Sequence, residues 1–160
     1  MAAKVDPIPA GYRTVTPYLV VKGAGEALDF YAKAFGAVET VRMPGPGGSV
    51  MHAEMKLGDS MIMLSDEFPD WGQLGPLSRG GTTFSIFLYV PDVDATFKNA
   101  VEAGCKVCMP PADQFWGDRF AKVSDPFGHE WAMATHVEDV TPEEMVKRMA
   151  AMEPPKPPNP

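Results

Sequence analysis

TVTPYLVVKGAGEALDFYAKAFG, residues 14–36, joins a strand pattern directly to a helix pattern. Its first eight residues, 14–21, are rich in β-branched side chains, which is typical of a strand. In EALDFYAKAF (26–35) the apolar residues recur every three or four positions, which indicates an amphipathic helix. Gly36 follows at the position where glycine commonly ends a helix. The stretch therefore predicts a strand that leads into a helix.

The second half of the chain repeats this order. TTFSIFLYV (82–90) has a strand composition, an amphipathic helix pattern follows it, and Gly104 ends that pattern as Gly36 ends the first. When Leu19 is placed on Leu88, a shift of 88 − 19 = 69 residues, the two helix-ending glycines fall within one position of each other. A repeat with this period indicates an internal duplication.

Each half continues with further strand patterns after its helix. In the first half, SVMHAEMKL (49–57) and SMIMLSD (60–66) flank a Gly58-Asp59 dipeptide, which is typical of a hairpin turn. The corresponding patterns of the second half are CKVCM (105–109), FAKVSD (120–125) and HEWAMATH (129–136). The repeated unit is therefore predicted to be βαβββ, which makes an α+β fold from two paired modules.

The expected organisation of the chain follows from these patterns. A Gly/Pro-rich connector separates the two halves, and Thr141, followed by Pro142 and Glu144, has the pattern of a helix N-cap. The expected segments are an N-terminal extension (1–11), a first βαβββ module (12–67), a connector (68–81), a second βαβββ module (82–138), a C-terminal helix (139–152) and a disordered Pro-rich tail (153–160).

The composition favours one globular domain and argues against two classes of partner. A chain of 160 residues with 45% hydrophobic residues is long enough for a single core. Its 14 basic and 21 acidic residues give a net charge of −7, which repels phosphate backbones and anionic lipids. We therefore expect neither nucleic acid nor a membrane as a partner. The N-terminal residues show no apolar run of the signal-peptide kind, so a cytoplasmic protein is expected.

Several motifs make the chain resemble the vicinal oxygen chelate superfamily, which includes glyoxalase I, bleomycin-resistance proteins and extradiol dioxygenases. ALDFYAKAFGA looks like the first helix of those proteins. Three further stretches resemble the PhnB-like branch of this superfamily in particular: MHAEMKLGDSMIMLSDE, FWGDRF and DPFGHEWAMATHVEDVTPEEM. The resemblance covers about residues 12–150. It implies that the paired modules form a curved sheet cup that holds a small molecule, and that the protein is a homodimer.

The resemblance also bears on a metal site. In the metal-dependent members, four His or Glu side chains, two from each module, hold a divalent ion. Carried over one by one, these positions fall on Thr16, Met63, Ser85 and Ala132, none of which is a competent ligand for zinc, nickel or iron. The resemblance therefore implies a cup without metal, and no cofactor is expected.

Histidines elsewhere leave an alternative open. His129 and His136 lie on opposite faces of one predicted strand, so they are not expected to share a metal ion. His52 and Glu54 share one face of another strand and are candidates for an acid and a base. If that face is instead exposed to solvent or to a dimer partner, His52 and Glu54 are ordinary surface residues. The alternation supports this reading, because Ala53 and the apolar residues two positions before and after it form the natural core face of the strand.

Strand alternation and the motifs together give the residues expected to bind a ligand. They share a face with the lost metal positions or lie in the FWGDRF loop, where a Trp can stack on a ring and an Arg can pair with an anion. These candidates are Thr16, Tyr18, Met61, Met63, Ser85, Phe87, Trp116 and Arg119. The alternatives for the last two are a dimer contact for Trp116 and an ion pair with an acidic neighbour for Arg119.

The predicted function is that of a PhnB-like, glyoxalase/bleomycin-resistance-type protein that binds a small organic, aromatic molecule in a metal-free cup and acts by sequestration. Two alternatives stay open. One is a metal-dependent lyase, isomerase or dioxygenase of the same superfamily. The other is a metal-free acid–base enzyme that uses His52 and Glu54. The sequence does not decide whether the protein is an enzyme.

Overall fold

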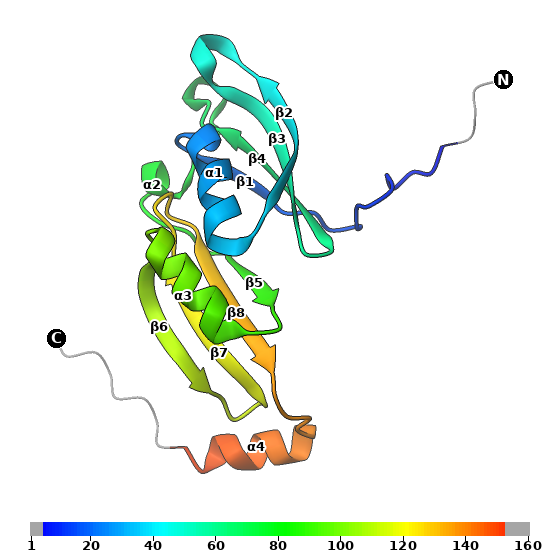
Figure 1. Ribbon diagram of the computed structural model, residues 1–160, viewed down its shortest axis with the longest axis vertical. Helices are drawn as coiled ribbons and strands as arrows, with labels where there is room; N and C mark the ends of the chain where they lie inside the picture. The colour runs from blue at the N-terminus through cyan, green and yellow to red at the C-terminus, as the bar shows by residue number, and fades with distance from the viewer. Residues whose placement is uncertain (1–4, 153–160) are drawn as a thin grey trace.

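The computed structural model describes residues 5–152, and the predicted Pro-rich tail (153–160) lies outside them. The first module contains a four-stranded sheet, one α-helix and a 3-10 turn (Pro46–Gly48) between its second and third strands (Figure 1). Its elements are β1 (Tyr18–Val21), α1 (Ala24–Phe35), β2 (Val38–Pro44), β3 (Val50–Leu57) and β4 (Ser60–Asp66). The strand order is β1-β4-β3-β2, with β1 parallel to β4 and the other pairs antiparallel.

The second module has the same topology. Its elements are β5 (Ser85–Tyr89), α3 (Val93–Ala103), β6 (Lys106–Asp113), β7 (Asp118–Ser124) and β8 (Glu130–His136). The strand order is β5-β8-β7-β6, again with the first pair parallel. The two modules lie one after the other along the longest axis of the molecule, with α1 against α3 (Figure 1). The predicted α+β fold of two paired βαβββ modules is confirmed.

Short helices lie outside the two modules. The connector forms a 3-10 turn (Pro69–Trp71) and α2 (Pro76–Arg79), and α4 (Pro142–Ala150) follows the second module. Thr141 caps α4 as predicted, because its hydroxyl accepts a hydrogen bond from the Glu144 N–H at 3.2 Å. Among residues 5–152, no helix is long and apolar enough to cross a membrane.

The ends of the helices follow the expected chemistry. Gly36 ends α1 with a φ of 71°, a left-handed conformation that glycine adopts without strain. The start of α1 is capped from β4, where Asp66 Oδ1 accepts the N–H groups of Gly23 and Ala24 at 2.8 and 2.9 Å. In the second module Asp92 caps α3 through the Ala95 N–H at 2.9 Å.

Both first strands are shorter than the sequence patterns suggested. The pattern at 14–21 becomes a strand only from Tyr18, because Pro17 has no N–H to give to a sheet ladder. The pattern at 82–90 becomes a strand only from Ser85, because the Thr82 hydroxyl bonds to the N–H and C=O of Phe84 and forms a local turn. In each case a local hydrogen-bond constraint replaces the sheet ladder.

The core joins the two modules through Asp125 and an aromatic group. Tyr31 of α1 lies 5.1 Å from the ring of Trp131 in β8, and both side chains are buried. Asp125 Oδ2 accepts hydrogen bonds from the Tyr31 hydroxyl and the Trp131 ring N–H, each at 2.8 Å. Its Oδ1 accepts the backbone N–H groups of Phe127 and His129, each at 2.9 Å. The DPFG stretch therefore closes the sheet and also ties it to the first module.

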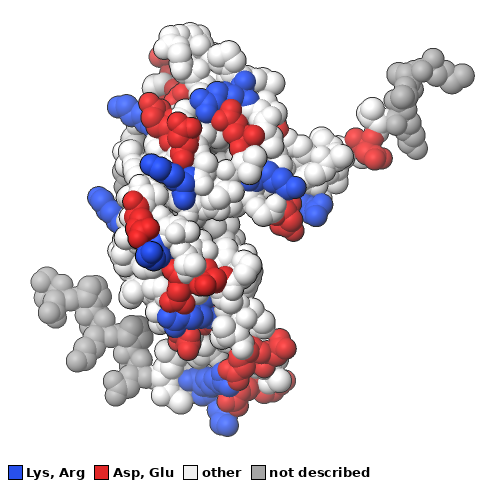
Figure 2. All heavy atoms as spheres, in the orientation of Figure 1, with Lys and Arg blue, Asp and Glu red and all other residues white. Residues whose placement is uncertain are grey.

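The charged surface is mixed rather than one-sided. Figure 2 shows Lys and Arg side chains interspersed with Asp and Glu over the face that carries α1, α3 and α4. Ion pairs account for part of this pattern, such as Arg148 with Glu138 at 2.7 Å. A continuous basic surface, the usual footprint of a nucleic-acid-binding protein, is not seen on this face.

Candidate functional site

Each sheet has one face covered by helices and one that is not. Helix α1 packs on the first sheet and α3 on the second, and the strand residues that face them are buried, as Ala53, Leu64 and Met133 are. Because strand side chains alternate, the neighbouring residues point to the other side, which we call the open face. The predicted ligand residues on strands lie on these open faces, with Tyr18 and Phe87 both about half exposed.

The larger cavity lies where the two modules meet. It has a volume of about 600 Å³ and is lined by both modules, including the segments 13–17, 57–62 and 86–91. Three predicted ligand residues line it: Thr16, Met61 and Phe87. The Phe87 ring lies 5.1 Å from the ring of Tyr89, which also lines the cavity. The cavity is therefore bounded on one side by two aromatic rings.

A smaller cavity lies between β1 and the connector. Its volume is about 270 Å³, and its lining includes Tyr18, Arg79, Phe84 and His129. The structure thus separates Tyr18 from Thr16, which the sequence analysis placed in one cup. His129 Nε2 lies 3.2 Å from the Val20 carbonyl, and its buried Nδ1 has no hydrogen-bond partner in the described part of the chain.

His52 and Glu54 belong to a chain of four hydrogen-bonded side chains on the open face of the first sheet. The Tyr12 hydroxyl donates to Glu54, His52 Nε2 lies 3.1 Å from the other Glu54 oxygen, and His52 Nδ1 lies 3.1 Å from the Tyr18 hydroxyl. Hydrogen bonds from Tyr12 and His52 lower the pKa of Glu54. The bond to Glu54 raises the pKa of Tyr12. Met63, opposite both Tyr18 and Glu54 in the sheet register, completes this face.

The open face of the second sheet carries an ion pair. Ser85 donates to Glu130 Oε2 at 3.0 Å, and Lys122 lies 2.5 Å from the same oxygen. Contact with Lys122, and then with Ser85, lowers the pKa of Glu130. The partner of Ser85 in the register is Glu130, whereas Ala132 lies opposite Phe87. Ser85 and Ala132 are therefore not direct partners in the sheet register.

Trp116 is held by Asp118, a residue that the sequence analysis did not select. The buried Asp118 carboxylate accepts hydrogen bonds from the Trp116 ring N–H and the Tyr89 hydroxyl, each at 3.0 Å. Its other oxygen lies 2.8 Å from His136 Nδ1. Asp118 therefore links the predicted stacking residue Trp116 to Tyr89 in the larger cavity.

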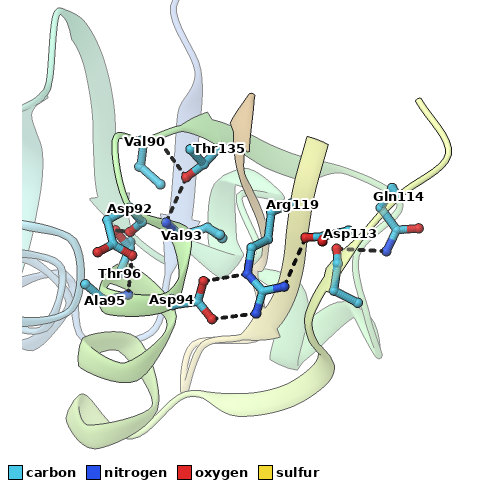
Figure 3. A network of polar contacts seen from close by, with 11 residues as sticks. Val90, Asp92, Val93, Asp94, Ala95, Thr96, Asp113, Gln114, Arg119 and Thr135 are labelled. Carbon is cyan, nitrogen blue, oxygen red and sulfur yellow. Dashed lines mark hydrogen bonds and ion pairs between the residues drawn. The ribbon is translucent and has the colours of Figure 1, made fainter. Parts of the chain in front are cut away.

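Arg119 points away from both cavities. In the alternation of β7 it lies on the helix side, where its guanidinium donates two hydrogen bonds to Asp94 at 2.6 and 2.8 Å and one to Asp113 at 3.0 Å (Figure 3). These contacts raise the pKa of Arg119 and lower the pKa of Asp94. The expectation that Arg119 pairs with a ligand anion is replaced by the alternative, an ion pair with an acidic neighbour.

The residues present do not fit a divalent metal ion. Within residues 5–152, no three His, Cys, Asp or Glu side chains converge so that they could hold one. Thr16 donates to the Arg13 carbonyl, and Ser85 donates to Glu130, so neither is poised as a metal ligand. His129 and His136 have separate surroundings in the fold. No chemical step is therefore assigned to a metal.

Three residues of these sites escaped the sequence analysis. Tyr12 lies in a segment without strand or helix pattern, so nothing in the sequence pointed to its contact with Glu54. Lys122 and Asp118 lie on the open face of β7, and the alternation within FAKVSD could have placed Lys122 there. No pattern in the FWGDRF stretch marked Asp118 as a site residue.

Comparisons with known proteins agree with this architecture. Residues 13–133 match the family model described as Glyoxalase/Bleomycin resistance protein/Dioxygenase superfamily. An uncharacterized protein of Mycobacterium bovis is 42% identical over 154 residues, which cover 94% of this chain and 97% of that protein. The crystal structure of TioX from Micromonospora sp. ML1 has a TM-score of 0.62 at 26% identity, covering 78% of this chain and 99% of TioX. The crystal structure of protein PA1353 from Pseudomonas aeruginosa has a TM-score of 0.64 at 26% identity, and the match covers 79% of this chain and 99% of PA1353.

Proposed function

Because the chain belongs to the Glyoxalase/Bleomycin resistance protein/Dioxygenase superfamily, we propose that it binds a small organic, aromatic molecule in the larger cavity without a metal ion. The observation that supports this most is the composition of the cavity wall. Phe87 and Tyr89 offer ring faces, Met61 offers an adaptable apolar side chain, and Thr16 supplies a hydroxyl. A volume of about 600 Å³ lies in the range of small-molecule sites.

The mode of action that we propose is sequestration, within the PhnB-like branch of the superfamily. A bound aromatic molecule would stack on Phe87 or Tyr89 and displace water from apolar surface, which needs no reacting group. Asp118 would support this binding indirectly, because it holds the Tyr89 hydroxyl at 3.0 Å. A cytoplasmic location stays a prediction of the sequence.

We also propose that the protein is a homodimer. Strands β1 and β5 each pair with only one neighbour in their sheets, so each leaves a free edge. Exposed apolar side chains also lie on the other two edge strands, among them Val38 and Met43 of β2 and Val107 and Met109 of β6. A second copy of the chain could cover both the edges and these side chains. Sedimentation analysis of the purified protein tests this, and a monomer at all concentrations would contradict it.

Binding in the larger cavity is tested by screening aromatic compounds with a thermal-shift assay and measuring the affinity of each hit by calorimetry. Phe87→Ala removes one ring from the wall, and an aromatic contact is worth about 0.5–1.5 kcal/mol beyond its buried area. With the lost area included, we expect the affinity to fall about tenfold or more. Met61→Ala should also weaken binding.

The matched control is Trp71→Ala. Trp71 is an exposed aromatic residue that packs on Phe68 and lines neither cavity, so its loss should leave the affinity unchanged. Equal affinity for the wild type and Phe87→Ala would contradict binding in the larger cavity. Metal-dependent chemistry, the first alternative of the sequence analysis, finds no fitting donor set in the described residues.

A further inference from the structure

The hydrogen-bond chain on the first sheet determines which ring nitrogen of His52 donates a hydrogen bond and which one accepts. The pKa of Glu54 is lowered, so its carboxylate is ionised near neutral pH and can only accept hydrogen bonds. His52 Nε2, at 3.1 Å from Glu54, must therefore be the donor in that contact. In a neutral imidazole the other nitrogen is an acceptor, so the Tyr18 hydroxyl donates to His52 Nδ1 at 3.1 Å.

This arrangement prepares Tyr18 to take up a proton. Its own proton points at His52 Nδ1, so the lone pairs of its oxygen are free for another donor. If the Tyr18 proton moves to Nδ1, the resulting imidazolium stays paired with the Glu54 carboxylate, whose Oε1 lies 3.1 Å from His52 Nε2. Tyr12 donates to the second oxygen of Glu54 and so fixes the orientation of that carboxylate. Glu54 and Tyr12 are positioning residues in this chain.

Tyr18 also lines the smaller cavity, which has features of an anion site for one aromatic ring. The wall includes Phe84, which is 51% exposed and offers a ring face. It also includes Arg79, whose guanidinium donates to the carbonyls of Gly72 at 3.0 Å and Leu74 at 3.3 Å. No carboxylate in the described part of the chain forms an ion pair with Arg79. The positive charge at this wall is therefore not neutralised by residues 5–152.

We propose that the smaller cavity binds a weakly acidic aromatic hydroxyl compound, such as a phenol, and that Tyr18 and His52 take up its proton. The ligand O–H bond breaks and its proton bonds to the Tyr18 oxygen. The former Tyr18 proton moves to His52 Nδ1, and His52 Nε2 keeps its own proton toward Glu54. The products are a bound phenolate beside Arg79 and an imidazolium paired with Glu54. Protons and charges balance without an oxidant, a reductant or a further reactant.

Among the described residues, those bonded to or paired with His52 bring no other charge that would oppose this transfer. From β1 it meets Tyr18, on its own strand β3 it meets Glu54, and Tyr12 reaches the same carboxylate from the N-terminal segment. Met43 of β2, its partner in the register, is uncharged. The proposal concerns the smaller cavity and does not depend on binding in the larger one.

The test uses 4-nitrophenol, because its phenolate absorbs visible light and its phenol form does not. The full chain is titrated with the probe at several pH values, and the pKa of the bound probe is read from the phenolate band. We expect the protein to lower the pKa of the bound probe by about one unit, which is about ten times more phenolate at a given pH. Tyr18→Phe keeps the ring and removes the hydroxyl, and His52→Gln removes the proton acceptor. Both should abolish most of the shift.

The matched control for His52→Gln is His136→Gln, which changes a histidine of the second module that lines neither cavity and should keep the full shift. Failure of 4-nitrophenol to bind, or binding without a lowered pKa, overturns the proposal. A full shift in folded Tyr18→Phe or His52→Gln overturns the relay and leaves charge stabilisation by Arg79 alone. If the lowered pKa of the probe is lost in Phe87→Ala but kept in Tyr18→Phe, the probe binds in the larger cavity. That result also overturns the proposal.

Discussion

Replacing Asp125 by asparagine should destabilise the protein strongly, although the two side chains have nearly the same shape. Each carboxylate oxygen of Asp125 accepts two hydrogen bonds, one pair from the Tyr31 and Trp131 side chains and the other from two backbone N–H groups. An amide has only one oxygen. Whichever way the asparagine side chain turns, its NH₂ group must face two donors.

The magnitude follows from the bonds that are lost. A hydrogen bond to a charged group contributes about 1.5–3 kcal/mol, and two of the four are lost in either orientation. Asp125 is buried, so water does not readily replace the missing acceptor. We expect Asp125→Asn to reduce the free energy of unfolding by about 3–5 kcal/mol, a large share of the stability of an ordinary domain. Tyr31→Phe removes one donor and should cost about 1.5–3 kcal/mol.

Urea denaturation followed by tryptophan fluorescence measures these free energies. The matched control is Asp70→Asn, an exposed aspartate with no hydrogen-bond role of this kind, which should change stability by less than about 0.5 kcal/mol. A loss below about 1 kcal/mol for Asp125→Asn would refute the reasoning. It would mean that the Asp125 contacts do not hold the two modules together.

Three further predictions concern groups outside the core. Hydrogen bonds from His136 to Asp139 and Asp118 raise its pKa, so they stabilise the folded state fully below about pH 6.5 and lose that effect as pH rises through the higher folded pKa. Thermal unfolding against pH should show this slope in the wild type, and His136→Gln should remove it. Burial raises the pKa of Cys105 to about 12, so a thiol reagent should modify the exposed Cys108 first, as peptide mass mapping would reveal. Elemental analysis of protein purified without chelator or metal-affinity resin should find far less than one divalent ion per chain, and a stoichiometric metal would contradict the donor-set argument.

The repeated architecture was predictable because its signals are local. The apolar spacing before Gly36, the turn at Gly58 and the Thr141 cap each depend on residues a few positions apart. The 69-residue shift that relates Leu19 to Leu88 then identified the second module as a copy of the first. A duplicated unit repeats its own short-range pattern, so a single sequence reveals it.

Strand alternation also placed His52 and Glu54 on one face of their strand, but it did not identify which residues contact that face. The sequence placed His52 and Glu54 opposite the core residue Ala53, and left open whether their face binds a ligand. Only the structure joins Glu54 to Tyr12, which lies 42 positions earlier in the chain. It also joins His52 to Tyr18, which lies 34 positions earlier. Contacts over such distances depend on how strands pair, which no local pattern contains.

The sequence by itself determined the two βαβββ modules and the ends of their helices, because residue type and short-range spacing decide these properties. Tertiary structure alone decided that Arg119 turns to Asp94, that Asp118 holds Trp116 and that Thr16 and Tyr18 line different cavities. The side of a sheet that helices cover, and the place where two modules meet, are set by packing across the whole chain. For this reason the residue types of the candidate sites were readable from the sequence, whereas their grouping into two separate cavities was not.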